Sequence, residues 1–209
     1  MANEDRPLVH LVDDEAAIRR SAGFMLKSVG YRVETYESGV ELLKRDRRLE
    51  PGCILLDVRM PEMDGLEVQQ ALGKRGIAFP VVVMTGHGDI SVAVRAMKAG
   101  AVDFLEKPFE KAALLASLEE GFARLRRAEA RSDRQRAAEV RIAALTPRER
   151  EVLEGLAQGL PNKSIAYDLG ISPRTVEIHR ANLMDKLAVR SLSEALRLAF
   201  AAGMGGGAA

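Results

Sequence analysis

Carboxylates follow two apolar runs in the first half of the chain, at the point where each run ends. Asp13 and Asp14 come directly after residues 8–12, and Asp57 comes directly after residues 53–56. If these runs are neighbouring strands of a parallel sheet, the three acids converge at the sheet edge where ligands bind. Converging carboxylates repel one another, and Mg²⁺ relieves this repulsion with one or two carboxylates, water and phosphate oxygens as its ligands. The pattern predicts Mg²⁺-assisted phosphoryl transfer onto an aspartate.

Two more side chains lie at the ends of the next two expected strands. Thr85 follows residues 81–84, and Lys107 follows residues 103–106 and precedes Pro108. A lysine ammonium is a compact charge that suits a phosphoryl group. A strand-end aspartate is commonly a helix cap and a lysine before proline commonly marks a turn, so only the ordered set is specific. An aspartate nucleophile screened by a cation and a lysine is phosphoryl-transfer chemistry.

The elements that must position these residues alternate along the first half of the chain. Short β-type runs are expected to be strands, and helix-length segments lie between them, with glycines at the joints. The expected strands are residues 8–12, 31–36, 53–56, 81–84 and 103–106, and the expected helices are roughly 14–28, 38–48, 64–74, 89–99 and from 110 onward. The fold class expected is α/β, a doubly wound five-stranded parallel sheet in the order 2-1-3-4-5, followed by an all-α helix-turn-helix domain.

The first half resembles a two-component receiver domain of the FixJ-type subgroup. Three segments carry the resemblance: residues 55–65, 84–89 and 104–109. The resemblance implies that Asp57 accepts the phosphoryl group, that Asp14 binds Mg²⁺ directly and Asp13 mostly through water, and that the Arg59 carbonyl contributes. Those four residues are the expected metal site.

The same resemblance implies a switch. Thr85 and the aromatic Phe104 would be its coupled pair, and the Lys107–Pro108 bond would be cis. Phe104 stands where the family often has tyrosine, so a hydroxyl hydrogen bond in the switched state is absent. His87, in a glycine-flanked loop, is a candidate gate above the acids, whereas His10, within a buried strand, is expected to be a packing residue.

A charged stretch separates the two halves. Leu115, Leu118, Phe122 and Leu125 form a helical apolar stripe that fades into an arginine-rich segment without glycine or proline. We expect a receiver domain over residues 6–122 and a helical linker over residues 123–143. The linker is either a solvated charged helix or a helix that pairs in a dimer.

The last third has a helix-turn-helix pattern over residues 144–202. Thr146 with Glu149 predicts a capping box, Asn162 and Ser172 are expected helix caps, and Gly170 allows a tight turn. The glycine-rich residues 203–209 are expected to be a disordered tail. A small helical interaction domain is the alternative reading, because residues 145–209 carry a net charge of only +1.

On the second helix of the motif, four residues at helical spacing form a face that the core does not need. Arg174, Glu177, Ile178 and Ala181 are expected to meet base edges in a major groove. The expected contacts to DNA phosphates are Lys163, Thr175, Arg180, Asn182 and Lys186.

This region resembles the LuxR-type helix-turn-helix family. The matching segments are residues 145–153, 162–166, 172–179 and 186–187. The family often has lysine at the position of Glu177, which should change the base preference. The resemblance implies that the last helix, about residues 192–200, serves in dimerisation.

Composition agrees with a cytoplasmic protein. The 209 residues include one cysteine, no run long enough to span a membrane and no apolar signal segment at the N-terminus. The net charge of +1 averages segments of opposite sign: −3 over residues 1–110, +3 over residues 111–144 and +1 over residues 145–209.

The expected function is that of a FixJ/NarL-type response regulator. A sensor histidine kinase would phosphorylate Asp57 with Mg²⁺, and this would promote a homodimer that binds double-stranded DNA and regulates transcription, with RNA polymerase as a further candidate partner. No enzyme activity is expected beyond phosphoryl transfer to, and hydrolysis from, its own aspartate. The alternatives are a DNA-binding regulator independent of phosphorylation and an aspartyl-phosphate phosphatase, which would need an acid at the position of Arg59.

Overall fold

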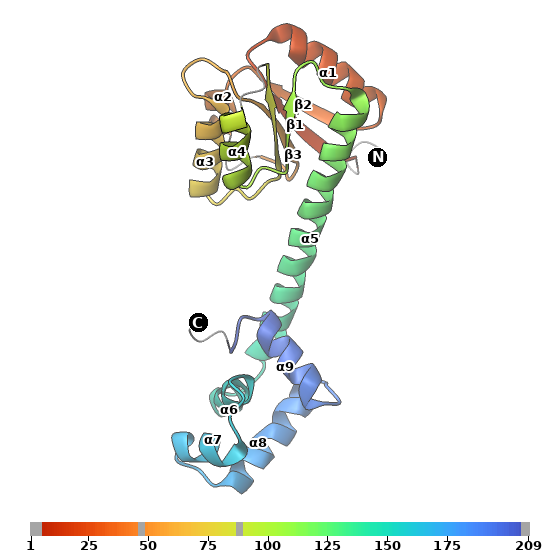
Figure 1. Cartoon of the computed structure of the whole chain (residues 1–209). Coiled ribbons are helices and arrows are strands. Elements are labelled where there is room, and N and C mark those ends of the chain that lie inside the picture. Colours follow the sequence, from red (N-terminus) through yellow and green to blue (C-terminus); the bar gives the residue numbers. More distant parts are fainter. Residues whose placement is uncertain (1–5, 46–48, 87–89, 206–209) are drawn as a thin grey trace. The chain divides into compact units, whose positions relative to one another are not determined.

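The chain forms two compact units, Met1–Arg127 and Ala128–Ala209 (Figure 1). The computed structural model describes residues 6–45, 49–86 and 90–205. The first unit consists of β1 (Leu8–Val12), α1 (Ala16–Ser28), β2 (Arg32–Tyr36), α2 (Gly39–Lys44), β3 (Cys53–Asp57), α3 (Gly65–Lys74), β4 (Val81–Thr85), α4 (Ile90–Lys98), β5 (Asp103–Glu106) and the start of α5 (Lys111–Ala143).

The five strands form one parallel sheet in the order β2-β1-β3-β4-β5. This confirms the fold class and strand order predicted from the sequence. Every residue of β1, β3 and β4 is buried, as expected for strands covered on both faces.

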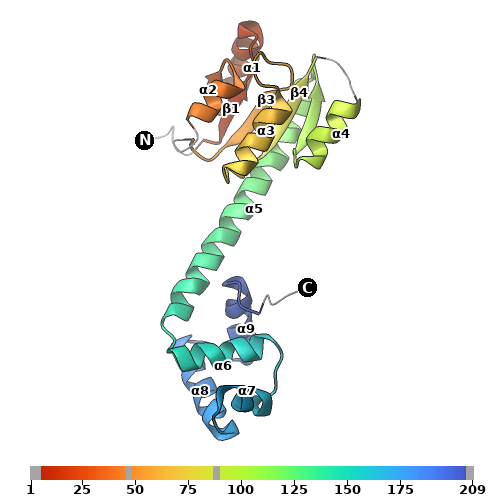
Figure 2. The ribbon, with the colours of Figure 1, turned by 90° about the vertical axis from the view of Figure 1, so that its left-hand side faces the viewer.

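Two apolar layers cover the sheet (Figure 2). On one face, Leu42, Leu66 and Leu72 bring α2 and α3 onto the strands, together with Ala96 of α4. On the other face, Leu26 of α1 and residues of α5 pack on the strands. The layers leave the carboxyl ends of the strands as the place where polar side chains can gather.

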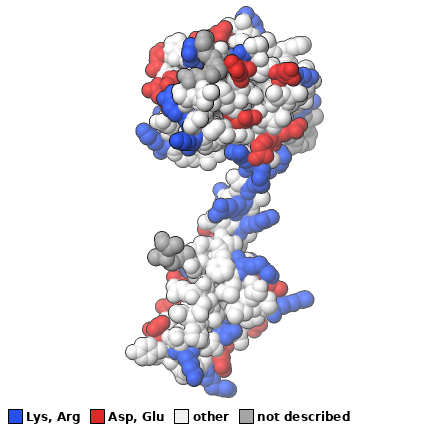
Figure 3. Space-filling view, viewed as in Figure 1, with Lys and Arg blue, Asp and Glu red and all other residues white. Residues whose placement is uncertain are grey.

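Helix α5 is a single helix of 33 residues. Its first turns bury Leu114, Leu118 and Phe122 in the first unit, and in its last turns Ala138 is buried and Ile142 packs in the core of the second unit. Arginine side chains gather along the part between Phe122 and Ala138 (Figure 3). The segment expected to be a linker therefore contributes a core residue, Ile142, to the second unit in its last turn.

The second unit continues with α6 (Pro147–Ala157), α7 (Asn162–Leu169), α8 (Pro173–Lys186) and α9 (Leu192–Ala201). The predicted capping box of Thr146 and Glu149 is present, and Ser172 caps α8 by accepting from the Thr175 amide. The prediction that Asn162 caps α7 is wrong. Pro161 occupies the cap position, and the Asn162 Oδ1 instead accepts a hydrogen bond from Arg180 at 2.9 Å.

The turn between α7 and α8 depends on Gly170. This residue has a left-handed backbone with φ of 65°, which a side chain would strain, and the Ile171 amide closes the turn on the Ala166 carbonyl at 2.9 Å. Beyond α9, Met204 is partly buried against the core of the unit. The first residues of the segment expected to be a disordered tail, 203–209, are therefore packed. Residues 206–209 lie outside the described part of the chain. In that described part, none of the helices has both the length and the apolar character needed to cross a membrane.

Candidate functional site

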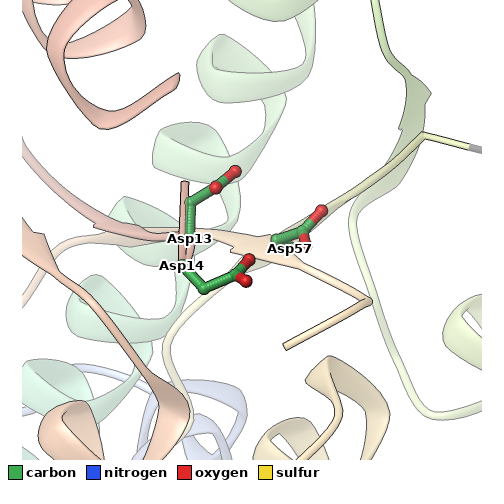
Figure 4. Close-up of side chains that lie close together, drawn as sticks. All are labelled: Asp13, Asp14 and Asp57. Carbon is green, nitrogen blue, oxygen red and sulfur yellow. The ribbon is translucent and has the colours of Figure 1, made fainter. Parts of the chain in front are cut away.

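Three aspartates meet at the carboxyl ends of β1 and β3 (Figure 4). Val12 pairs with Leu56 across the two strands, so the residues that follow each of them lie at the same sheet edge. Asp13 is fully buried, Asp57 is 4% exposed and Asp14 is exposed. One carboxylate oxygen from each of the three lies within 4.8 Å of the others.

Lys107 joins this cluster from the end of β5. Its Nζ donates to the Asp13 Oδ2 at 2.6 Å and lies 2.8 Å from the Asp57 Oδ1. The Lys107 amide donates to the Thr85 carbonyl at 2.7 Å, and the Lys107–Pro108 peptide bond is cis, as expected. The ammonium is therefore fixed between two buried carboxylates.

Burial and charge act in opposite directions on this group. Burial raises the pKa of Asp57 above its usual value, although the Lys107 ammonium works to lower it. Burial alone would lower the pKa of Lys107, but hydrogen bonds to Asp13 and Asp57 raise it above its usual value. Lys107 thus stays charged and compensates part of the carboxylate charge.

The donor set fits a divalent cation. Three carboxylates and one ammonium leave a formal charge of −2 in a space a few ångströms across. Asp14 is open to solvent while the other two acids are buried, which suits a hard cation that keeps part of its water shell. Arg59, whose carbonyl is the other expected ligand, is exposed and follows Asp57 by two residues in the connection to α3.

Two features that the sequence pattern did not predict hold the backbone around the three aspartates. The Arg19 Nη1 donates to the carbonyl oxygens of Asp13 and Asp14 at 2.7 and 2.8 Å. At the start of α3, a Cβ on Gly65 would lie 2.2 Å from the Asp57 carbonyl oxygen, so this position needs glycine. The sequence offers little indication of this role for Arg19, because the residue lies five positions after Asp14, on the next helix.

The expected switch pair occupies the neighbouring strands. Thr85 ends β4 and is 2% exposed, one residue beyond the Met84 that pairs with Asp57. Phe104 of β5 pairs with Val83 and is partly buried against the core under α2, α3 and α4. His87, the candidate gate, lies outside the described residues.

The second unit presents the expected base-reading face. Arg174, Glu177, Ile178 and Ala181 are all exposed on α8, and Ile178 is 54% exposed although it is apolar. The opposite face of α8 buries Val176 and Leu183 in the core. The helix is therefore held by one face and leaves the other free of core contacts.

The residues expected at DNA phosphates differ in their surroundings. Lys163 and Asn182 are exposed, while Thr175 lies at the start of α8, where its hydroxyl is 2.8 Å from that of Ser172. Arg180 donates to Asn162 of α7, which fixes its guanidinium between the two helices.

Lys186 has an ionic partner within the unit. Its Nζ donates to the Glu149 Oε2 at 2.8 Å, and the Glu149 side chain is only 4% exposed. Burial works to raise the pKa of Glu149, but the hydrogen bonds from Lys186 and from Thr146 hold it below its usual value. Lys186 therefore compensates a buried carboxylate, an arrangement that helical spacing did not reveal because the two residues belong to different helices.

Tyr167 is a further exposed residue that the sequence pattern did not single out. It lies on α7, one turn after Lys163, and is 88% exposed. Its position four residues after Lys163, an expected phosphate contact, was the only indication in the sequence that Tyr167 lies on the same exposed face.

Comparison with known proteins gives matches to both units. The model of the response regulator receiver domain matches residues 9–119, and that of the bacterial regulatory proteins of the luxR family matches residues 143–199. The transcriptional regulatory protein FixJ of Azorhizobium caulinodans is 49% identical over 94% of this chain and 93% of its own length.

Two solved structures cover nearly the whole chain. The response regulator StyR is similar with a TM-score of 0.75 and 42% identity, over 93% of this chain and 98% of its own. Full-length FixJ from B. japonicum is similar with a TM-score of 0.59 and 45% identity, over 95% of this chain and 98% of its own.

Proposed function

Because the chain belongs to the FixJ-like response regulators, transcription regulators with a receiver domain and a LuxR-type DNA-binding domain, we propose that phosphorylation of Asp57 switches its binding to DNA. The observation that supports this most is the buried Asp57, with Lys107 and two further aspartates around it at one sheet edge. The proposed phosphodonor is a phosphohistidine of a sensor kinase.

The first step is nucleophilic. A carboxylate oxygen of Asp57 attacks the phosphorus, a new P–O bond forms, and the P–N bond breaks with its electron pair left on the histidine nitrogen. Lys107 is already 2.8 Å from one Asp57 oxygen, where its ammonium can screen the added negative charge. Gly65 keeps the start of α3 close to the Asp57 carbonyl and so holds the loop in place.

Mg²⁺ would be held by Asp13, Asp14, Asp57 and the Arg59 carbonyl. When bound, it supplies positive charge that offsets the repulsion between the carboxylates and the incoming phosphoryl oxygens. The loop that presents Asp13 and Asp14 is fixed by Arg19, so these ligands need little rearrangement.

The new charge then acts on the neighbouring strands. Thr85 moves its hydroxyl toward the phosphoryl oxygens, and Phe104 packs further inward in response. Phe104 is only partly buried, so it has apolar surface that an inward movement would bury. Energetically the change is a shift of population, because phosphate acts only by binding the active state more strongly than the resting one.

The output is DNA binding by two copies. Residues 145–209 carry a net charge of +1, which is a weak electrostatic footprint for one reader. Pairing through α9 would double the phosphate contacts and read two half-sites. Glu177 and Ile178, both exposed on α8, are the proposed determinants of base preference.

Treatment with a small phosphodonor and Mg²⁺, followed by intact-mass measurement, tests the chemistry. We expect a gain of one phosphoryl group in the wild type and in Asp133→Asn, a control at an exposed aspartate of α5, and none in Asp57→Asn. Absence of the adduct in the wild type, or its persistence in Asp57→Asn, would overturn the proposal. Turnover of an external phosphoester would point instead to a phosphatase.

A further inference from the structure

Asp103 joins the expected switch residue Phe104 to helix α5 through its two carboxylate oxygens. The Phe104 amide donates to the Asp103 Oδ1 at 2.8 Å, and the Ser117 hydroxyl of α5 donates to the Asp103 Oδ2 at 2.6 Å. The shorter distance is typical of a hydroxyl that donates to an ionised carboxylate. One side chain therefore ties a strand to a helix, and the pair is here called the Asp103–Ser117 latch.

The latch lies on the opposite face of β5 from the Phe104 ring. Successive side chains of a strand point to opposite faces. Phe104 packs with the layer that contains α2, α3 and α4, whereas Leu105 packs with the layer that contains α5, and Asp103 shares the side of Leu105. A movement of Phe104 toward one layer therefore shifts a backbone amide that is bonded to the other layer.

The Ser117 hydroxyl has one proton to donate and two acceptors within reach. It lies 2.6 Å from the Asp103 Oδ2 and 3.0 Å from the Ala113 carbonyl oxygen, one turn earlier in α5. Ser117 is 3% exposed, on the same buried face as Leu114 and Leu118, so its hydroxyl needs a partner within the protein. If Asp103 withdraws, the hydroxyl turns to Ala113 and keeps a hydrogen bond. The latch can therefore open without leaving a buried donor unpaired.

The two arrangements of this hydroxyl differ in strength. The bond to Asp103 is the shorter one and has a carboxylate acceptor, whereas the bond to Ala113 has a neutral carbonyl acceptor. Hydrogen bonds to ionised acceptors are roughly twice as strong as neutral ones. The closed latch is thus the favoured arrangement, and the open one is a defined alternative. An element with two discrete arrangements is what energetic coupling between distant sites needs.

Helix α5 extends the consequence beyond the first unit. It runs unbroken from Lys111 to Ala143, and its Ile142 packs in the core of the second unit. Ser117 lies near the start of this helix, on the face that packs in the first unit. The latch therefore acts on a helix whose residues enter the cores of both units.

We propose that Asp103 and Ser117 are positioning residues that hold the resting state and pass the switching of Phe104 to α5. When Phe104 packs inward after phosphorylation of Asp57, its amide and Asp103 move away from α5. Ser117 then exchanges Asp103 for the Ala113 carbonyl, and the start of α5 is released from β5. The proposal rests on the proposed function, because it needs phosphorylation to raise the affinity for DNA.

Affinity for DNA with and without phosphodonor, measured on the full chain, tests the latch. The DNA is a fragment selected by binding to the wild-type protein after treatment with phosphodonor and Mg²⁺. A bond made only in the resting state lowers the population of the active state, so its removal should raise that population. We expect Ser117→Ala to raise the affinity of the untreated protein about fivefold, as expected for one hydrogen bond. The affinity of the treated protein should stay within about twofold.

The direction of this change distinguishes a latch from a purely structural contact. A general loss of stability would lower both affinities, whereas opening of the latch raises that of the untreated protein alone. Ser132→Ala is the matched control, because Ser132 is a serine of the same helix beyond the end of the first unit at Arg127. It should change neither affinity by more than about twofold.

A double-mutant cycle tests whether the two residues act through one bond. Asp103→Ala should raise the untreated affinity at least as much as Ser117→Ala does. The double variant should have no larger effect than Asp103→Ala alone, because both changes remove the same hydrogen bond. Wild-type affinity in untreated Ser117→Ala, or effects of the two changes that multiply, would overturn the proposal.

Intact mass and the response of the wild type separate this proposal from the proposed function. Ser117→Ala should gain one phosphoryl group as the wild type does, because Ser117 bonds to Asp103 and Ala113 and not to Asp57. A wild type whose DNA affinity is the same with and without phosphodonor would contradict the proposed function, and the latch with it. A wild type and a Ser117→Ala variant that respond to the same extent would contradict the latch alone.

Discussion

Replacing Lys107 with alanine should destabilise the first unit in a way that Mg²⁺ reverses. The ammonium lies 2.6 Å from Asp13 and 2.8 Å from Asp57, and the two carboxylate side chains are 0% and 5% exposed. Without Lys107 both acids remain buried with no ammonium between them, and the formal charge of the cluster changes from −2 to −3.

The magnitude follows from the burial of the pair. Removing one partner of a buried ion pair costs about 3–5 kcal/mol. Because the neighbouring Asp14 is exposed and gives water access to the cluster, we expect the lower end, about 3 kcal/mol in the free energy of unfolding, in the presence of a chelator. Mg²⁺ at a hundred times its Kd raises the free energy of unfolding by about 2.7 kcal/mol. Because the site of the variant is more negative, Mg²⁺ should bind the variant more tightly than the wild type.

Hydrogen exchange of the β1 and β3 amides, measured with chelator and with saturating Mg²⁺, checks this prediction. Because these amides belong to the first unit, the measurement reports the stability of that unit separately from that of the second. Lys111→Ala is the matched control, because it removes an exposed lysine at the start of α5 and should cost less than about 0.5 kcal/mol. Equal losses for the two variants, or a Mg²⁺ effect no larger than in the wild type, would refute the reasoning.

Three further predictions concern other parts of the chain. Lys186→Met should lower the stability of the second unit by about 2 kcal/mol at neutral pH, because Glu149 stays buried and charged, whereas Glu149→Gln/Lys186→Met should recover part of this loss in urea denaturation. Burial lowers the pKa of His10 below its usual value, so protonation favours the unfolded chain: the stability of the first unit should fall as pH drops below about 6.5, by up to about 1.4 kcal/mol per pH unit. That pH-dependent loss should shrink in His10→Gln. Gly65→Ala should cost at least about 2 kcal/mol and slow phosphorylation of Asp57, because its Cβ would lie 2.2 Å from the Asp57 carbonyl oxygen; unchanged phosphorylation kinetics would contradict this role.

The sequence predicted the sheet well because its three central strands are buried on both faces. β1, β3 and β4 appear in the sequence as continuous apolar runs, and the acids directly after them had to meet once the strand order was known. The helix starts at Thr146 and Ser172 were predictable for a similar reason, since capping is local chemistry.

Contacts between distant elements were not predictable in this way. Asn162 has the right side chain for a cap, but it is the first residue of α7, after Pro161 at the cap position, and its side chain pairs with Arg180. The apolar stripe of α5 fades after Leu125, whereas Ala138 and Ile142 are buried further along the helix, and Ile142 packs in the core of the second unit. The ion pair of Lys186 with Glu149 likewise joins two helices whose packing no local spacing reveals.

The affinity of the phosphorylated protein for selected DNA, compared with that of Asp57→Asn under the same treatment, tests the central claim most directly. We predict that phosphodonor and Mg²⁺ raise the affinity of the wild type about tenfold or more, a coupling free energy of at least about 1.4 kcal/mol, and leave the affinity of Asp57→Asn unchanged. Equal affinities for the treated wild type and the treated variant would contradict it and would favour a regulator that binds DNA independently of phosphorylation.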